Sequence, residues 1–407
     1  MISTFSWLDY SEKERRRVVE VIKAFEEPDT RDELGIGAVR DGFADLFFPG
    51  TSTIQTRAKY FFFVPWVYLQ LERQKVPSSE IARKARQHEI SLIDALCKSG
   101  EKDGVIGIEA RSTLKRLPSN IYWQGLATWG IRLYPGSQDQ YHRSIGAFYQ
   151  SKQEQPRNDD GEPIDGSISR NWHAPLPHAP GGFPDQSTFR LKPTEAEYLR
   201  ERIMARLPGT LLAFLVDRGH KSDPVDFPWE HPQHAEFPAR CREQLEHARN
   251  FSEMIHGAQL LYNLLLAEKT ADKEKLGSYT KRLEEWFTRI RTRSTAFDSW
   301  DRRQFWDVVV SGGARVTLLT QSFINTWLDL ASGLTSAATL IKDDHARRLI
   351  CERELALKRD QARLQNPRAL ELWSGAAGTA QLNYRWRIAQ TIVGDILEGL
   401  LRDKTNA

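Results

Sequence analysis

Apolar residues recur every three or four positions through most of this chain, which is the spacing of amphipathic helices. Near the C-terminal end, for example, Ile388, Ile392 and Ile396 fall on one helical face. Thr194 and Glu197 form a capping box ahead of another apolar run. We therefore expect an all-α fold, or one very nearly so, with helices at residues 11–28, 37–48, 54–74, 77–97, 121–131, 194–203, 211–216, 239–268, 273–294, 302–311, 316–330, 343–364 and 380–401.

A stretch rich in Pro, Gly and Asp, residues 151–190, interrupts this helical pattern. Segments of this length without periodicity are usually linkers or long functional loops, and a chain of 407 residues is long enough for two domains. We expect an N-terminal helical domain at 1–150 and a C-terminal helical domain at 191–407. Asn171, Trp172 and His173 indicate that part of the linker or loop is tied down onto a domain.

Residues 32–66 read DELGIGAVRDGFADLFFPGTSTIQTRAKYFFFVPW, the most unusual segment of the chain. Its Pro-Gly-Thr-Ser-Thr elbow, residues 49–53, directly precedes a predicted helix. Backbone N–H groups and hydroxyls would then converge with the positive end of a helix dipole, an arrangement that suits phosphate or carboxylate. Arginine side chains on either side would complete an anion clamp. The predicted phosphate-binding residues are Arg40, Gly50, Thr51, Ser52, Thr53, Arg57 and Lys59.

A purely structural interpretation of the same residues stays open. One of the three hydroxyls would cap the helix, while Arg40 and Arg57 would pair with Asp41 and Asp45 and hold two helices together. The aromatic row at 60–66 likewise has two interpretations. It either forms a basic-aromatic face for single-stranded nucleic acid with Lys59, or it belongs to the core.

Charge and motif content narrow the function classes. The net charge of +3 is too balanced to indicate a nucleic-acid binder from bulk electrostatics alone. The helix at 343–364 mixes basic and acidic residues, which we interpret as a solvated face. The chain contains no phosphate-loop motif and no complete catalytic signature, so we expect no cofactor and lean against an enzyme.

Metal and membrane association are also not expected. Three widely spaced cysteines form no C-x-x-C pair, and the His231/His234 and His173/His178 pairs lie in Pro-rich loops without further ligands. The N-terminal residues lack the apolar region of a signal peptide, and no apolar run is long enough to span a bilayer. We expect a soluble, cytoplasmic protein.

Several sequence blocks carry a family resemblance: SWLDYSEKERRR, the segment at 32–66, IYWQGLATWGIR, GSQDQYHRS, NWHAPLP and QLNYRWRIAQTIVGDILEGL. Together they resemble an uncharacterised bacterial domain-of-unknown-function family, over nearly the whole chain from residue 6 to residue 400. The family has no established activity, so the resemblance implies no catalytic residue. It implies an origin in multi-gene bacterial loci that look like phage-defence or DNA-processing systems.

Three functional hypotheses follow. The first is an accessory subunit of such a defence-type system that engages DNA or RNA through the predicted phosphate-binding residues, with Arg15, Arg16 and Arg17 adding charge. The second is a protein–protein scaffold that holds a helicase or nuclease encoded in the same locus. The third is an enzyme with an unfamiliar active site, built from Asp32, Arg40, Asp41, Asp45 and Arg57.

Overall fold

The computed structural model describes residues 32–153 and 170–402. Within these ranges the chain is helical and forms no β-sheet; its one isolated bridge is an antiparallel pairing of Arg132 with Trp172. The all-α fold class is therefore confirmed. The predicted helix at 11–28, with its three arginines, lies outside the described residues. None of the described helices combines the length and apolarity that crossing a bilayer requires.

The described chain separates into two compact units that differ from the predicted domains. The first unit comprises residues 32–43 and 244–382, and the second comprises 44–153, 170–243 and 383–402. Two helices contribute residues to both units: α2 (Gly37–Phe47) and α9 (Ala239–Lys269). Each unit thus combines segments from both predicted domains. Residues 170–190 of the predicted linker belong to the second unit.

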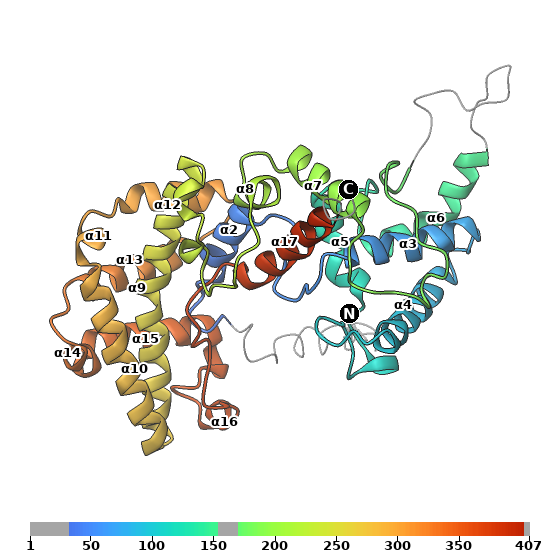
Figure 1. Ribbon diagram of the computed structural model, residues 1–407. Helices are drawn as coiled ribbons and strands as arrows, with labels where there is room; N and C mark the ends of the chain where they lie inside the picture. The colour runs from blue at the N-terminus through green and yellow to red at the C-terminus, as the bar shows by residue number, and fades with distance from the viewer. Residues whose placement is uncertain (1–31, 154–169, 403–407) are drawn as a thin grey trace, which may run out of the picture. The chain divides into compact units, whose positions relative to one another are not determined.

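The first unit is built on α9, which buries the apolar side chains of Leu245, Phe251 and Ile255. In Figure 1, α10 (Lys273–Thr292) runs beside α9. Trp286 of α10 donates its indole N–H to the Glu253 carbonyl at 2.7 Å. The remaining elements of this unit are α10 (Lys273–Thr292), α11 (Ser294–Asp298), α12 (Arg302–Ser311), α13 (Leu318–Ser332), α14 (Ala337–Lys342), α15 (Asp344–Lys358), η4 (Arg359–Gln361) and α16 (Pro367–Glu371).

Two charged residues of α15 contradict the predicted solvated face. Glu354 is fully buried and accepts hydrogen bonds from the Tyr262 hydroxyl and from the backbone N–H of Arg363, at 2.6 and 2.8 Å. Arg353 is 7% exposed and donates to the Leu34 carbonyl at 2.8 Å. The prediction is wrong for these residues because hydrogen bonds within the protein replace the hydrogen bonds to water that a charged group loses when it is buried.

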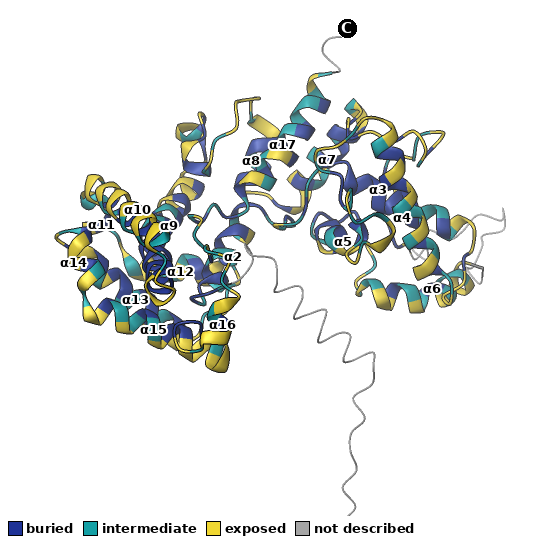
Figure 2. Ribbon diagram, turned by 90° about the horizontal axis from the view of Figure 1, so that it is seen from below, coloured by how far each residue is buried: buried dark blue, intermediate teal, exposed yellow. Residues whose placement is uncertain are grey.

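The second unit is organised around α3 (Tyr60–Arg73), most of which Figure 2 colours as buried. The Phe61 ring stacks on Trp129 with centroids 3.8 Å apart, so the core interpretation of the aromatic row is the one observed. In Figure 1, α17 (Trp386–Leu401) lies beside α7 (Pro193–Arg206) and α8 (Leu211–Arg218). The elements are α3 (Tyr60–Arg73), α4 (Ile81–Lys98), η1 (Arg111–Thr113), α5 (Pro118–Thr128), α6 (Gln138–Gln153), α7 (Pro193–Arg206), α8 (Leu211–Arg218), η2 (Pro228–Glu230), η3 (His234–Glu236) and α17 (Trp386–Leu401).

Residues 170–190 are anchored to this unit along their length. The Leu133 N–H donates to the Asn171 carbonyl, and the His173 N–H donates to the Ile131 carbonyl, both at 2.8 Å. Further along, the Phe183 ring packs edge-on against Trp66 of α3, with centroids 5.3 Å apart. The expectation that Asn171, Trp172 and His173 are tied down is confirmed.

Candidate anion-binding site

The Pro-Gly-Thr-Ser-Thr elbow ends α2 instead of beginning α3. The Thr51 hydroxyl and N–H both reach the Phe48 carbonyl, at 2.7 and 3.1 Å, and α3 begins only at Tyr60. The predicted start of this helix near residue 54 is therefore wrong. The intervening backbone is held by other groups, since the N–H groups of Thr56 and Arg57 both donate to the Tyr122 hydroxyl. The elbow consequently lacks the helix dipole on which its predicted anion affinity depended.

The elbow is also closely packed against its neighbours. Gly50 has φ of +85°, and a Cβ at this position would lie 2.5 Å from the Trp129 indole nitrogen. The Gln55 side chain accepts from the Ser52 N–H at 3.2 Å and donates to the Gly50 carbonyl at 3.1 Å. Thr53 is exposed. The polar backbone groups of the elbow thus serve the local fold.

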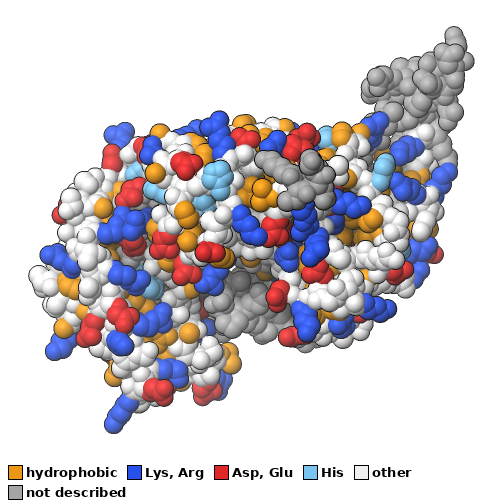
Figure 3. All heavy atoms as spheres, in the orientation of Figure 1, with side chains coloured by type: hydrophobic (Ala, Val, Ile, Leu, Met, Phe, Trp, Pro, Cys, Tyr) orange, Lys and Arg blue, Asp and Glu red, His pale blue; other side chains and the backbone are white. Residues whose placement is uncertain are grey.

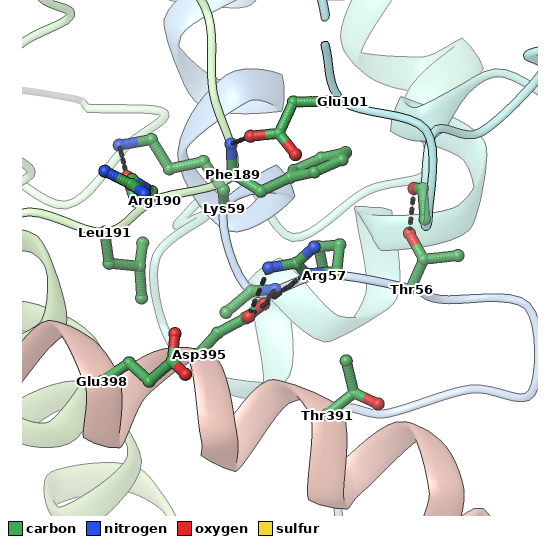
Figure 4. Close-up of polar contacts among 12 residues, drawn as sticks. Thr56, Arg57, Lys59, Glu101, Phe189, Arg190, Leu191, Thr391, Asp395 and Glu398 are labelled. Carbon is green, nitrogen blue, oxygen red and sulfur yellow. Dashed lines mark hydrogen bonds and ion pairs between the residues drawn. The ribbon is translucent and has the colours of Figure 1, made fainter.

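Arg57 does form an anion clamp, and the anion that it holds is Asp395 of α17 (Figure 4). The Arg57 Nη2 and Nε atoms donate to Oδ1 at 2.7 and 3.1 Å, and Nε also lies 3.0 Å from Oδ2. The Ala58 N–H, just before α3, donates to Oδ2 at 2.9 Å. Both carboxylate oxygens therefore receive two contacts, and the predicted pairing of Arg57 with Asp41 or Asp45 is wrong.

The other predicted ion-pair residues divide between the units. Arg40, in the first unit, pairs with the adjacent Asp41 as predicted, with Nε 3.1 Å from Oδ1. In the second unit Asp45 accepts from Arg385 Nη1 at 2.6 Å, and the same nitrogen donates to the Thr51 carbonyl at 2.9 Å. Asp45 thus supports the elbow through Arg385, a partner that the sequence interpretation did not identify.

Lys59 is buried on a different side of the same segment. Figure 4 shows it directed toward the backbone of Arg190, whereas Arg57 is directed toward Asp395. The Lys59 ammonium donates to the Glu195 carboxylate and, at 3.2 Å, to the Arg190 carbonyl. It is 5% exposed, and burial lowers its pKa while Glu195 opposes that change. An ammonium has three N–H donors, so these two partners leave one further donor.

A cavity of about 410 Å³ adjoins Lys59. Its apolar wall contains Phe63, Trp66 and Phe183. Three further cationic side chains, Arg190, Lys192 and Arg402, also line it, and none of its lining residues is acidic.

Arg190, Lys192 and Arg402 differ in the partners that they contact. Arg402 donates to the Leu191 carbonyl at 3.0 Å and lies 3.9 Å from Glu398. Arg190 and Lys192 are exposed, and neither forms an ion pair with any carboxylate in the described part of the chain. We define Arg190, Lys192 and Arg402 as the basic rim.

Sequence reasoning missed the basic rim, although a signal was present. Arg190, Leu191 and Lys192 alternate polar and apolar character directly before the Pro193 that opens α7. In extended backbone, residues two positions apart share a side, so this alternation brings the two cations together. Leu191 between them is 2% exposed and lines the same cavity. The signal was lost because the segment fell at the end of the predicted linker.

Within the described residues, the other candidate side chains make local contacts, and no metal site is found. Asp32 accepts from the Ile36 and Gly37 N–H groups, both at 2.7 Å, and so satisfies donors at the start of α2. His173 lies 3.1 Å from both the Tyr198 hydroxyl and Arg202 Nη1. Across residues 32–153 and 170–402, no three His, Cys, Asp or Glu side chains group in a way that would hold a metal ion.

Of the comparisons with known proteins, the one with family models finds a match. No curated protein and no solved structure matches the chain. A family model matches residues 2–399, nearly the whole length. The chain therefore belongs to a family of unknown function, DUF6361.

Proposed function

We propose that the second unit binds nucleic acid through phosphate groups held at the cavity beside Lys59. The observation that carries the proposal is the convergence of four cationic side chains, one of them buried, on a cavity with no acidic lining. Charge-assisted hydrogen bonds from Arg and Lys to phosphate oxygens are among the stronger polar contacts in proteins. The predicted class of ligand is retained, and its site moves from the elbow to the basic rim.

The same geometry favours phosphate contacts over base stacking. Phe63 and Trp66 are each only 1% exposed, so their faces are committed to the core. On the face shown in Figure 3, Lys and Arg side chains are interspersed with Asp and Glu side chains. We therefore expect a local contact with few phosphates, insensitive to sequence and weakened by salt.

Fluorescence anisotropy across a salt series tests the proposal, with labelled single- and double-stranded DNA and RNA. The informative variant is Arg190→Ala/Lys192→Ala. The matched control is Lys115→Ala/Arg116→Ala, because both of these residues are exposed, belong to the second unit and lie outside the cavity lining. On single strands, each lost phosphate contact should lower the slope of log K against log salt by about 0.7.

The proposal predicts weaker binding and a shallower slope for the rim variant only. Equal losses in the rim and control variants would indicate nonspecific attraction and would overturn the assignment of the site. We extend the proposal to an accessory role, in which the chain holds nucleic acid for partner proteins encoded in the same bacterial locus.

A scaffold function has support of a different kind, from the first unit. Leu318 and Leu319, in the first turn of α13, are 81% and 76% exposed, and Val310 at the end of α12 is 59% exposed. Exposed apolar patches often mark protein–protein contacts. Light scattering of the purified protein tests whether these residues form a contact between copies of the chain: self-association that Leu318→Ser/Leu319→Ser abolishes would show such a contact, and a monomer at all concentrations would exclude it.

A further inference from the structure

The charge balance of the cavity favours a doubly charged ligand group. Glu195 neutralises Lys59, and Glu398 is shared between Arg402 at 3.9 Å and Lys221 at 2.6 Å. Arg190 and Lys192 keep their full charges, so at least two positive charges are uncompensated. A phosphomonoester carries about −1.5 to −2 at neutral pH, whereas each phosphate within a strand carries one negative charge.

The shape of the cavity favours the end of a chain over its middle. Its inner wall is closed by Lys59, Phe63 and Trp66, which are 5%, 1% and 1% exposed. Its volume of about 410 Å³ lies toward the lower part of the range of small-molecule pockets, about 300–1,000 Å³. A phosphate inside a strand has a nucleotide on each side and needs an open groove. A terminal phosphate enters with chain on one side only.

The available donors match the acceptors of a terminal phosphate. A phosphomonoester presents three strong acceptor oxygens. The Arg190 guanidinium offers a planar fork for two of them, and Lys192 offers a point charge. The Lys59 ammonium lies at the inner wall, 5.3 Å from the centroid of the Trp66 ring, and the exposed Thr188 hydroxyl also lines the cavity.

We infer that this cavity is a receptor for a phosphomonoester group, carried either by the end of a nucleic-acid strand or by a free mononucleotide. The inference rests on the proposed function, because it names the group that the same site selects. Selectivity follows from the uncompensated charges of Arg190 and Lys192 and from the closed inner wall behind them.

A direct comparison of two strands tests the inference. Anisotropy is measured with single-stranded oligonucleotides of one sequence, labelled at the far end and terminating in either a phosphate or a hydroxyl. We expect the phosphorylated strand to bind about tenfold more tightly, because its terminal phosphate adds charge-assisted hydrogen bonds. A tenfold change in Kd corresponds to about 1.4 kcal/mol of binding free energy. Arg190→Ala/Lys192→Ala should remove this preference, and Lys115→Ala/Arg116→Ala should retain it. Competition with a mononucleotide and with inorganic phosphate distinguishes the two sources of the group.

The outcomes separate the two proposals. Equal, salt-sensitive affinity for both strands would overturn the phosphomonoester inference and leave nucleic-acid binding intact. No binding of either strand at low salt would overturn both. A preference that persists in the folded rim variant would place the receptor elsewhere. Circular dichroism of each variant establishes that it is folded, which we expect because Arg190 and Lys192 are exposed.

Discussion

Asp395→Ala is the substitution that tests most sharply whether Arg57 is a structural clamp. In the native unit the Arg57 side chain is 25% exposed and the Asp395 side chain is 8% exposed. Removing the carboxylate leaves a mostly buried guanidinium without its anion, and it leaves the Ala58 N–H without an acceptor. Both losses act on the native state, because water solvates these groups when the chain unfolds.

The expected cost follows from the geometry. Removal of one partner of a buried pair typically costs about 3–5 kcal/mol of unfolding free energy. Water reaches about a quarter of the Arg57 side chain, so we lower the expectation to about 2–4 kcal/mol. Asp395→Asn, which keeps one acceptor oxygen, should cost less than Asp395→Ala. A loss of this size is a large part of the stability of an ordinary domain, about 5–15 kcal/mol.

Urea unfolding, followed by tryptophan fluorescence and circular dichroism, measures the effect, with attention to separate transitions of the two units. Asp226→Ala is the matched control, since Asp226 pairs with Arg387 of α17 at 3.4 Å while both side chains are more than 70% exposed. The control should change stability by less than about 0.5 kcal/mol. If Asp395→Ala were no more costly than Asp226→Ala, the clamp would not hold α17 and our reasoning would be refuted.

Two further predictions concern stability alone. Glu89 is buried on α4 and accepts from the Ser119 N–H and hydroxyl at 2.8 and 2.7 Å, and burial raises its pKa from 4.5 to about 7. The folded pKa lies above the unfolded one, so this stabilising contribution is present below pH 4.5 and is lost as pH rises through about 7. Urea unfolding from pH 4.5 to 8 should therefore show wild type losing up to about 3 kcal/mol relative to Glu89→Gln, and parallel curves would contradict this. Gly257→Ala should destabilise the first unit by about 1–3 kcal/mol, because the new Cβ would lie 2.3 Å from the buried Trp286 ring. Helix propensity alone predicts a stabilisation of about 1 kcal/mol, so the sign of the change in urea unfolding decides between the two.

Periodicity was sufficient for most of the long helices and insufficient for the polar helix α6. The α9 helix was predicted because apolar residues recur at helical spacing from Leu245 to Leu264. The α6 helix was missed, since its sequence is mostly polar and only Tyr141 and Ile145 are deeply buried, at 1% each. Local pattern also does not show the two compact units, because each unit joins segments that are distant in sequence.

The candidate site illustrates the same limit. Arg57 was predicted to hold a ligand anion or to pair with Asp41 or Asp45, whereas its observed partner is Asp395, 338 residues away on α17, and no local signal connects the two. The helix start near residue 54 was inferred from turn residues, whereas the Tyr122 hydroxyl and Asp395 hold that backbone in a non-helical path. Buried polar partners of this kind are set by tertiary packing, which a single sequence does not display.

The most direct measurement compares nucleic-acid binding by a rim variant with binding by an elbow variant. Salt-series anisotropy on single-stranded DNA would be run with wild type, Arg190→Ala/Lys192→Ala and Ser52→Ala/Thr53→Ala, each shown to be folded. We expect that only the rim variant loses affinity and salt dependence. Loss in the elbow variant with retention in the rim variant would contradict the account and return the phosphate site to the elbow.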